Sequence, residues 1–304
     1  MIGTRLARVI APFLATALAS SCIFAPDTAK PTPTPTPKVS LVATRPRLEL
    51  STYQYALQTK GKIRVAVREN SRPLSVRSGS AYDGFEADVA REIARAIWGT
   101  NDDPDTHIQW IPVDDSMRIA ALTSNQADIA IAGLTISDDN RKVIDLTDGY
   151  YKDGQRLLVK KSNDQIKDLV DVSGGDQTVC AIKGSTWDQS LRVATNDRAK
   201  ILELDTLDFC VQALRSGAAD AVTQDEAVLL GLVFRDPDVK IVAKPITDDL
   251  VGVGIKKNVS ADRQGFRDFI NTTLLTIVAN RTWAKLYQKH ITPLSGDTKQ
   301  LPTD

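Results

Sequence analysis

Hydrophobic residues recur with helical spacing over residues 83–98. One stripe of this segment is apolar at every fourth position: Phe85, Val89, Ile93 and Ile97. Such spacing places the four side chains on one face of a helix, which we expect to be buried. Asp83, with Glu86 three residues later, is the expected start signal of this helix.

Short apolar segments between the helical ones predict strands. Residues 63–67 alternate as a strand, and residues 178–182 are the expected counterpart in a second lobe. Strands that alternate with helices indicate a mainly parallel, helix-covered sheet in each lobe. Two further extended stretches, 155–159 and 250–255, have glycine beside or within them and are candidates for strands that cross between the lobes. The C-terminal part would then return to the first lobe.

Two ten-residue stretches, 121–130 and 213–222, match at five positions. In each, we expect a helix to end at a residue suited to the left-handed conformation, and an acid to precede the next strand. These residues are Asn125 and Asp128 in the first stretch, and Gly217 and Asp220 in the second. The second stretch begins 92 residues after the first, which is the size of one small α/β unit. The repeat therefore predicts two similarly built lobes.

Composition narrows the functional classes. The chain has 304 residues, with 38 basic and 38 acidic side chains, and 42% of its residues are hydrophobic. These values are typical of a globular protein and allow a large core. A formal charge of zero lacks the basic excess that a phosphate backbone attracts, so nucleic acid is not an expected partner.

The first 22 residues have the organisation of a secretory signal. Arg5 and Arg8 precede an apolar stretch, 9–19, that is too short to span a bilayer. Small residues then lead directly to Cys22, as in the lipobox of bacterial lipoproteins, where the thiol is acylated and becomes the new N-terminus. The alternative is ordinary signal cleavage after Ala19 or Ser21.

A proline-rich segment follows the signal. Residues 31–37 alternate proline and threonine, a pattern that favours extended polyproline II, and we interpret residues 23–50 as a linker between the membrane and the folded body. Without residues 1–38, the chain holds 34 bases and 37 acids. A slightly acidic body is not attracted to an anionic membrane, so the predicted acyl chains on Cys22 would supply the attachment.

Two cysteines remain, Cys180 and Cys210, and an oxidising compartment favours a disulfide between them. The alternative is two buried free thiols. The chain has only two histidines, His107 and His290, and neither lies at ligand spacing from a cysteine, so no metal site is expected.

Four motifs occur in an order that resembles the amino-acid type of bacterial extracytoplasmic solute-binding proteins, family 3, of ABC importers. They are Gly84-Phe85-Glu86-Ala87-Asp88, Gly133-Leu134-Thr135-Ile136-Ser137, Lys183-Gly184-Ser185-Thr186 and Thr223-Gln224-Asp225-Glu226. The similarity runs over roughly residues 60–292. The Cys180…Cys210 pair followed by Val211-Gln212-Ala213-Leu214 is most similar to the glutamate-binding lipoproteins of the family.

The resemblance implies a two-lobed α/β fold of the periplasmic-binding-protein type II, with helices on both faces of each sheet and two crossover strands. Lobe 1 is expected to comprise residues 51–153 and 249–304, and lobe 2 residues 154–248. A monomer is expected.

The resemblance also implies a ligand site, and the chemistry of an amino acid explains its residues. An α-carboxylate needs a guanidinium or N–H donors, and an ammonium needs a carboxylate. Asp225 matches the position that holds the ammonium; otherwise it is a solvated acid or a helix cap. Ser185 and Thr186 match positions that bind the carboxylate at a helix N-terminus, unless they are only an N-cap. Thr135 and the backbone of Gly133 match first-lobe contacts.

One position departs from the family. The carboxylate-binding arginine is expected at position 140, where this chain has Asn140, and Arg141 follows. Three explanations are open: a looser Asp138-Asp139 turn brings Arg141 into the site, a base on the loop of Arg68, Ser71 and Arg72 replaces the family arginine, or the ligand lacks an ordinary α-carboxylate. This loop is polar and cationic where the family usually places an aromatic ring, which favours an acidic solute.

These features predict a lipid-anchored extracytoplasmic protein that captures a small polar amino acid, of the acidic or amide type, and delivers it to an ABC permease without a cofactor. A ligand-sensing lipoprotein that reports to a receptor or kinase is one alternative. A dehydratase-like enzyme of the same fold is another, but no nucleophile–base arrangement supports it.

Overall fold

The computed structural model describes residues 46–257 and 261–296, and the predicted signal, Cys22 and most of the linker lie outside these ranges. The described chain forms two five-stranded sheets and a small three-stranded one. The first sheet has the order β5 (Ile108–Val113), β1 (Ile63–Arg68), β6 (Ile129–Thr135), β13 (Asp249–Lys256) and β7 (Ile144–Asp153). The small sheet comprises β2 (Asn70–Ser71), β3 (Ser75–Ser78) and β4 (Ala81–Asp83).

The second sheet repeats the plan of the first. Its order is β10 (Lys200–Leu204), β9 (Thr178–Ile182), β11 (Ala221–Asp225), β8 (Gln155–Lys160) and β12 (Val239–Val242). In each sheet one strand runs against the others: β13 pairs antiparallel with β6 and β7, and β8 pairs antiparallel with β11 and β12. The expected mainly parallel sheets are therefore confirmed.

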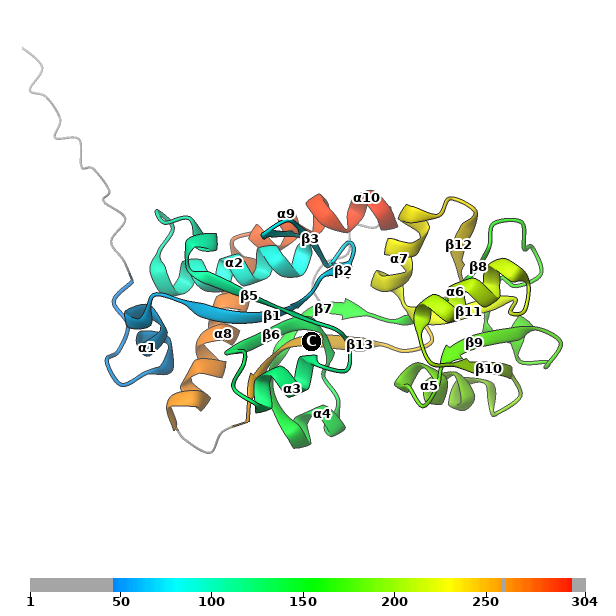
Figure 1. The fold of residues 1–304 in the computed structure, drawn as a ribbon, viewed down its shortest axis with the longest axis horizontal. Coiled ribbons are helices and arrows are strands. Elements are labelled where there is room, and N and C mark those ends of the chain that lie inside the picture. The colour runs from blue at the N-terminus through cyan, green and yellow to red at the C-terminus, as the bar shows by residue number, and fades with distance from the viewer. Residues whose placement is uncertain (1–45, 258–260, 297–304) are drawn as a thin grey trace, which may run out of the picture. The chain divides into compact units, whose positions relative to one another are not determined.

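Helices cover both faces of the sheets (Figure 1). They are α1 (Tyr53–Lys60), α2 (Phe85–Trp98), η1 (Pro104–Thr106), α3 (Arg118–Thr123), α4 (Asp138–Val143), η2 (Leu169–Val172), α5 (Thr186–Thr195), α6 (Leu207–Ser216), α7 (Glu226–Arg235), α8 (Ala261–Ala279), α9 (Thr282–His290) and α10 (Thr292–Ser295). Alternate residues of a strand reach opposite cores. In β1, Val65 packs with α2, α8 and α9, while Ala66 packs with α3.

The second sheet is covered in the same way. Leu158 of β8 packs in the core that contains α6 and α7, and Val159 packs in the core that contains α5. A disulfide joins Cys180 of β9 to Cys210 of α6, with their Cα atoms 5.4 Å apart. Each sheet thus has a hydrophobic core on each face, and the two sheets form the two lobes of the α/β fold.

The internal repeat has a structural basis. Asn125 and Gly217 both have the left-handed backbone conformation, with φ of 60° and 82°. Asp128 accepts a hydrogen bond from the N–H of Arg64, at 2.7 Å, and its own N–H donates to the carbonyl of the same residue. Asp220 is joined to Thr178 by the same two hydrogen bonds, at 2.8 Å each. Each acid thus fixes the start of one strand against the strand beside it.

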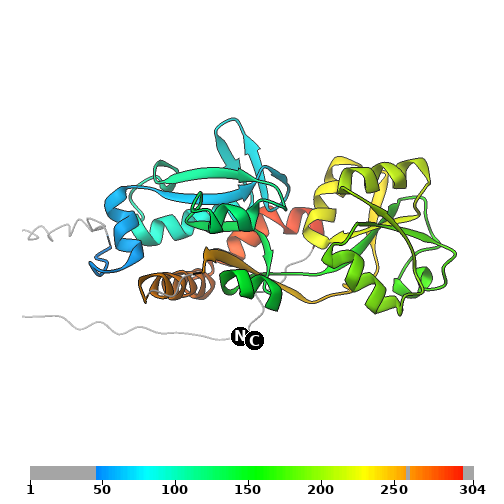
Figure 2. The ribbon, with the colours of Figure 1, turned by 60° about the horizontal axis from the view of Figure 1, so that its bottom comes forward.

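The chain crosses between the sheets at two junctions, β7–β8 and β12–β13, which both ribbon views show running together (Figures 1 and 2). The carbonyl of Gln155 accepts from the N–H of Ile246 at 2.7 Å, and the N–H of Gln155 donates to the Thr247 hydroxyl at 3.0 Å. A Cβ on Gly154 would lie 2.7 Å from the Thr247 carbonyl oxygen, so the close approach of the two segments requires glycine. The stretches 155–159 and 250–255 belong to the sheets, and the crossings lie at their ends.

The expected start of α2 was wrong. Gly84, and not Asp83, precedes the helix, and Asp83 ends β4. Gly84 has φ of +125°, and a Cβ there would lie 2.3 Å from the carbonyl oxygen of Leu74. Glu86 cannot complete a capping box because its side chain is buried in the interior.

Candidate functional site

Arg68 lies at the carboxyl end of β1, beside Gly133 of the neighbouring parallel strand β6. In open α/β sheets this end of the strands is where ligands bind. A Cβ on Gly133 would lie only 2.2 Å from Nη2 of Arg68, so the guanidinium rests directly on the glycine, whose φ is +62°. The side chain of Arg68 is 11% exposed.

The buried side chain of Glu86 fixes the position of Gly133 beside Arg68. Its Oε1 accepts hydrogen bonds from the N–H of Gly133, at 2.7 Å, and from the hydroxyl of Tyr150, at 2.6 Å. Burial favours a lower pKa for Arg68, but the charges of Glu86 and Asp115 oppose it, and the pKa of Arg68 is raised overall. Arg68 therefore neutralises a buried acid, and sequence analysis did not predict this role for Glu86.

Arg118, at the start of α3, adds a second cation. Its Nη1 donates to the carbonyl oxygen of Ala132 at 2.9 Å and also to that of Gly133. Asp115 joins the two arginines, with its Oδ1 3.3 Å from Nη1 of Arg68 and 3.7 Å from Nη1 of Arg118. Both backbone groups of Gly133 are thus hydrogen-bonded within the protein, which leaves its N–H unavailable to a ligand.

Asn140 stays close to the site, whereas Arg141 faces away from the protein interior. Ser137 caps α4 by accepting from the N–H of Asn140 at 3.2 Å, and the Asn140 side chain donates to the carbonyl of Thr135 at 2.8 Å. Arg141 is exposed, and within the described residues its guanidinium has no hydrogen bond. The helix start is regular, and one residue along a helix is a rotation of about 100°.

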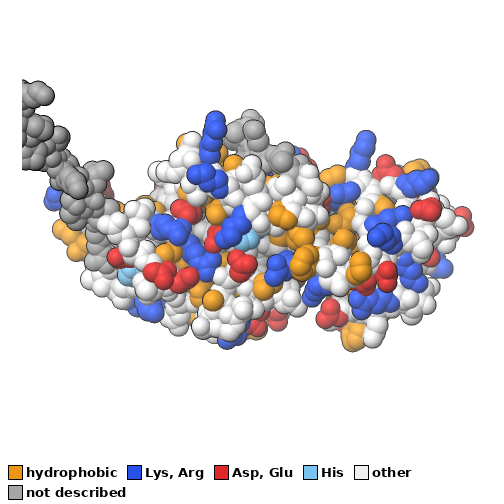
Figure 3. All heavy atoms as spheres, turned by 90° about the horizontal axis from the view of Figure 1, so that it is seen from above, with side chains coloured by type: hydrophobic (Ala, Val, Ile, Leu, Met, Phe, Trp, Pro, Cys, Tyr) orange, Lys and Arg blue, Asp and Glu red, His pale blue; other side chains and the backbone are white. Residues whose placement is uncertain are grey.

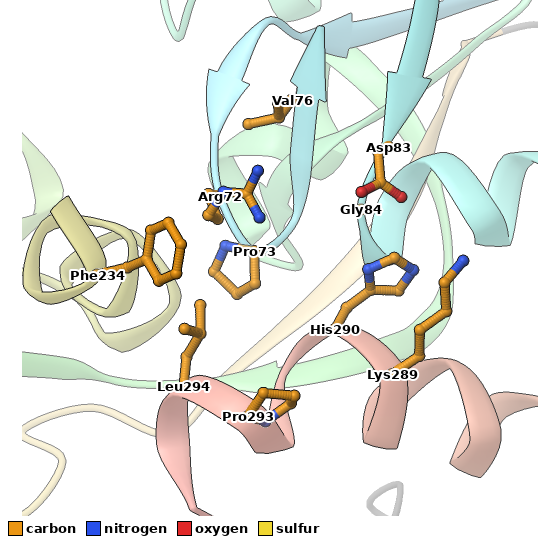
Figure 4. Close-up of a pocket in the computed structure, with 10 residues that line it drawn as sticks. All are labelled: Arg72, Pro73, Val76, Asp83, Gly84, Phe234, Lys289, His290, Pro293 and Leu294. Carbon is orange, nitrogen blue, oxygen red and sulfur yellow. The ribbon is translucent and has the colours of Figure 1, made fainter. Parts of the chain in front are cut away.

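Arg72 belongs to a different cavity (Figure 4). Its guanidinium carbon lies 5.0 Å from the ring centroid of Phe234 in α7. This cavity of about 220 Å³ is lined by Arg72, Pro73, Val76, Asp83, Gly84, Phe234, Lys289, His290, Pro293 and Leu294. Ser71 precedes Arg72 and is 8% exposed. Arg68, at the start of this loop, thus lies at the carboxyl end of β1 in the candidate site, whereas Arg72 lies in the cavity beside Phe234.

Asp225 ends β11 on the second sheet. The indole N–H of Trp187 donates to its Oδ1 at 2.7 Å. Burial raises the pKa of Asp225 to about 6, while the Trp187 hydrogen bond and the charge of Arg68 act in the opposite direction. Trp187 is a contact that the motifs did not predict, although it directly follows Ser185 and Thr186.

Ser185 and Thr186 lie at the N-terminus of α5. The Ser185 hydroxyl accepts from the N–H of Asp188 at 3.2 Å, so it acts as the N-cap of the helix. Thr186 is exposed at the first position of the helix. Trp187, the residue after Thr186, joins the N-terminus of α5 to Asp225. The predicted residues Ser185, Thr186 and Asp225 therefore lie in the same part of the second lobe.

The two sheets bring opposite charges to this region. Arg68 and Arg118 come from the first, and Asp225 from the second, and the charge of Asp225 influences the pKa of both arginines. Elsewhere, basic and acidic side chains are interspersed on the face shown in Figure 3. Among the described residues, no group of three or more His, Cys, Asp or Glu side chains is placed to hold a metal ion. In the same residues, no helix is long and apolar enough to cross a membrane.

Comparisons with known proteins agree with this architecture. The chain is 31% identical over 238 residues to the ABC transporter glutamine-binding protein GlnH of Bacillus subtilis (strain 168), covering 78% of this chain and 83% of the relative. It is 26% identical to the glutamate-binding protein GluB of Corynebacterium glutamicum, covering 76% of this chain and 79% of the relative. A solved structure of an ancestral arginine-binding protein bound to arginine superposes with a TM-score of 0.63 and 31% identity, covering 76% of this chain and 98% of that one.

Residues 63–293, which include both sheets and every residue of the candidate site, match the profile of the bacterial extracellular solute-binding proteins, family 3. The order of the strands, the crossings and the opposed charges all lie inside the matched region. The chain belongs to this family of solute-binding proteins.

Proposed function

We propose that the protein captures a small polar amino acid, of the acidic or amide type, between its two lobes and delivers it to an ABC permease. The observation that supports this proposal is the opposite charge of the two lobes: Arg68 and Arg118 in the first, and Asp225 in the second. Arg68 and Arg118 suit the carboxylate or amide groups of such a ligand, and Asp225 suits its ammonium. An acidic or amide amino acid carries an ammonium and a carboxylate on its α-carbon, and a second carboxylate or an amide on its side chain.

The polarity of the site orients the ligand. Arg68 takes the anionic end or the side-chain amide, and Arg118 blocks the Gly133 carbonyl, which leaves Asp225 as the principal acceptor for the ammonium. Thr135, Ser185 and Thr186 supply hydroxyl or N–H donors around it, and Asn140 takes the position of the family arginine. Arg141 is exposed and contributes only through the backbone of α4.

Residues 51–153 and 249–304 act as one lobe in this proposal, and residues 154–248 as the other. The two short crossings permit rotation of one lobe against the other, and a ligand in contact with both lobes favours the closed arrangement. The hydrogen bonds of Gln155 to Ile246 and Thr247 keep the two crossings moving together.

The rest of the proposal rests on the sequence. Cys22, at the end of the signal segment 1–22, carries the lipid anchor, and residues 23–50 link it to the folded body. This places a monomeric protein on the extracytoplasmic face of the cell membrane. The names of the glutamine- and glutamate-binding relatives support the substrate class.

A thermal-shift screen of the soluble body, residues 39–304, tests the proposal. The panel contains the common amino acids together with dicarboxylates that lack an ammonium. A ligand at 100 times its Kd adds about 2.7 kcal/mol to the free energy of unfolding, so glutamate, aspartate, glutamine or asparagine should raise the Tm.

Asp225→Asn should bind more weakly and so show a smaller shift, and Arg141→Ala is its matched control, which should keep the full shift. No shift with any amino acid would reject the proposed substrate class. Intact-mass analysis of protein extracted from membranes tests the anchor separately, because an unmodified Cys22 contradicts it.

A further inference from the structure

The N-cap residue of α7 does not cap its own helix. An aspartate at this position ordinarily accepts a hydrogen bond from a backbone N–H in the first turn. The carboxyl group of Asp225 makes no such hydrogen bond, and its Oδ1 accepts from the indole of Trp187 instead. The first turn of α7 therefore needs acceptors from elsewhere, because unpaired N–H groups at a buried helix end are unfavourable.

Residues of the first crossing supply these acceptors. The N–H of Glu226 donates to the carbonyl of Gly154 at 2.9 Å. The N–H of Ala227 donates to Oδ1 of Asp153 at 3.3 Å, and this oxygen also accepts from the N–H of Gly154 at 2.9 Å. Asp153 is 8% exposed and Ala227 is fully buried, so water does not replace these contacts.

We infer that Asp153 is a positioning residue for ligand binding: it caps α7 in place of Asp225 and thereby leaves the Asp225 carboxyl directed toward Trp187 and the ligand. This inference rests on the proposed function for the identity of the ligand. Asp225 is the N-cap residue of α7, and an N-cap carboxyl ordinarily accepts from an N–H at the position of Ala227. Without the acceptor at Asp153, the carboxyl of Asp225 would therefore turn to this N–H and away from the site.

The acidic residues around Asp153 determine which substitutions can test its role as a hydrogen-bond acceptor. Burial, followed by the charge of Asp225, raises the pKa of Asp153 well above its usual range, and Glu226 acts in the same direction. Asp249 pairs with Asp153 across β7 and β13, and Glu226 is itself paired with Arg156 at 2.6 Å. A protonated Asp153 still accepts through its carbonyl oxygen. Asp153→Asn keeps that acceptor, and Asp153→Ala removes it.

The NMR resonance of the Trp187 indole N–H in the ligand-free protein reports whether the Asp225 carboxyl accepts its hydrogen bond. It is assigned from its loss in Trp187→Phe. We expect a hydrogen-bonded, slowly exchanging indole in the wild type and in Asp153→Asn, and an upfield, faster-exchanging one in Asp153→Ala. Should Asp153→Ala not fold, Asp153→Ser gives the same contrast, because its hydroxyl is too short to reach the N–H of Ala227.

Calorimetric titration with L-glutamate and L-glutamine then measures the consequence. We expect Asp153→Asn to bind within about twofold of the wild type, and Asp153→Ala about tenfold more weakly, which corresponds to about 1.4 kcal/mol. In an Asp225→Asn background, Asp153→Ala should weaken binding no further.

An unchanged Trp187 resonance in Asp153→Ala overturns the inference, as does an equal loss of affinity in the presence and absence of the Asp225 carboxylate. Wild-type protein that binds neither amino acid overturns the proposed function instead. The indole resonances of the ligand-free protein then still decide whether Asp153 directs Asp225.

Discussion

The two lobes hold their charges at the candidate site in different ways. In the first lobe, Arg68 and Arg118 lie among acids of the same lobe, Glu86 and Asp115. In the second lobe, the carboxyl group of Asp225 has an indole N–H as its hydrogen-bond partner, and the cations whose charges lower its pKa, Arg68 and Arg118, belong to the first lobe. The arginines of the first lobe are thus already paired with an acid of their own lobe. In the proposed function, Asp225 gains an ionic partner only when the ligand ammonium binds.

This difference also separates the two sides by pH. An arginine stays charged throughout the physiological range. Asp225, whose pKa burial raises to about 6, changes charge within that range. The positive charge of the first lobe is thus independent of pH in this range, whereas the negative charge of Asp225 in the second lobe depends on pH.

Glu86→Ala should have the largest effect, because it breaks the balance of charge in the first lobe. It removes the acceptor for the Gly133 N–H and the Tyr150 hydroxyl. It also takes away one of the acidic charges that offset the burial of Arg68, while the ion pair with Asp115 remains. A buried donor left without its acceptor costs about 1–3 kcal/mol, so with two such donors urea unfolding should show a loss of about 2–6 kcal/mol. Asp139→Ala, at an exposed acid of the same lobe, is the control and should leave the midpoint unchanged. Equal behaviour of the two variants would contradict the role of Glu86.

Asp225→Asn should have the opposite effect on the second lobe of the ligand-free protein. The folded pKa of about 6 lies above the usual value of 3.8, so the folded protein resists ionisation of this group. The stability that the protonated form contributes is present below pH 4 and is lost as the pH rises to 6. Asp225→Asn should therefore be more stable than the wild type by up to about 3 kcal/mol at pH 7.5, with the difference vanishing near pH 4. A variant less stable than the wild type at pH 7.5 would refute this account of Asp225.

The affinity for an amino acid should decrease as the pH falls through 6. Binding of an ammonium requires the ionised carboxylate of Asp225, so the Kd should rise about tenfold for each pH unit below its pKa. Calorimetry in buffers of different ionisation enthalpy should detect proton release from the protein near pH 6. The profile of Asp225→Asn should be flat over the same range, and a flat wild-type profile would exclude this linkage.

Trp187→Phe should have the smallest effect, because it changes the pKa of Asp225 and leaves the carboxyl group in place. The indole hydrogen bond lowers the pKa of Asp225, so its loss should move the midpoint of the affinity profile to higher pH by about one unit or less. Trp98→Phe, in the first lobe, is the matched control and should leave the midpoint in place. A midpoint that moves to lower pH in Trp187→Phe would show that the indole does not stabilise the carboxylate.

Periodicity and the internal repeat predicted most of the fold. The strand expected over 178–182 is β9, and the turns at Asn125 and Gly217 have the left-handed conformation that their residue types favour. These features depend on local backbone preferences, which a sequence displays. The start of α2 was predicted wrongly, because Gly84 is required by its contact with Leu74, a neighbour that sequence spacing does not reveal.

The site was less predictable for the same reason. The motifs indicated Asp225, and the loop after the first strand offered Arg68 as one possible replacement for the family arginine. Arg118 of α3 and Trp187 of α5 lie outside the quoted motifs and were not predicted. Their importance follows from hydrogen bonds to Gly133 and Asp225, which are distant in sequence. The Asp138-Asp139 segment raised the possibility that Arg141 enters the site, whereas the structure has a regular Ser137 cap and an exposed Arg141.

Calorimetric titration with L-glutamate and with glutarate, which lacks the ammonium, separates the roles of the two lobes when the wild type and Asp225→Asn are compared. If the first lobe binds the anionic groups and Asp225 the ammonium, the wild type should prefer L-glutamate by about a hundredfold, since a hydrogen bond to a charged group contributes about 1.5–3 kcal/mol. Asp225→Asn should reduce this preference to less than about tenfold. Equal binding of the two compounds by the wild type, or an undiminished preference in Asp225→Asn, would contradict the division of charge between the lobes.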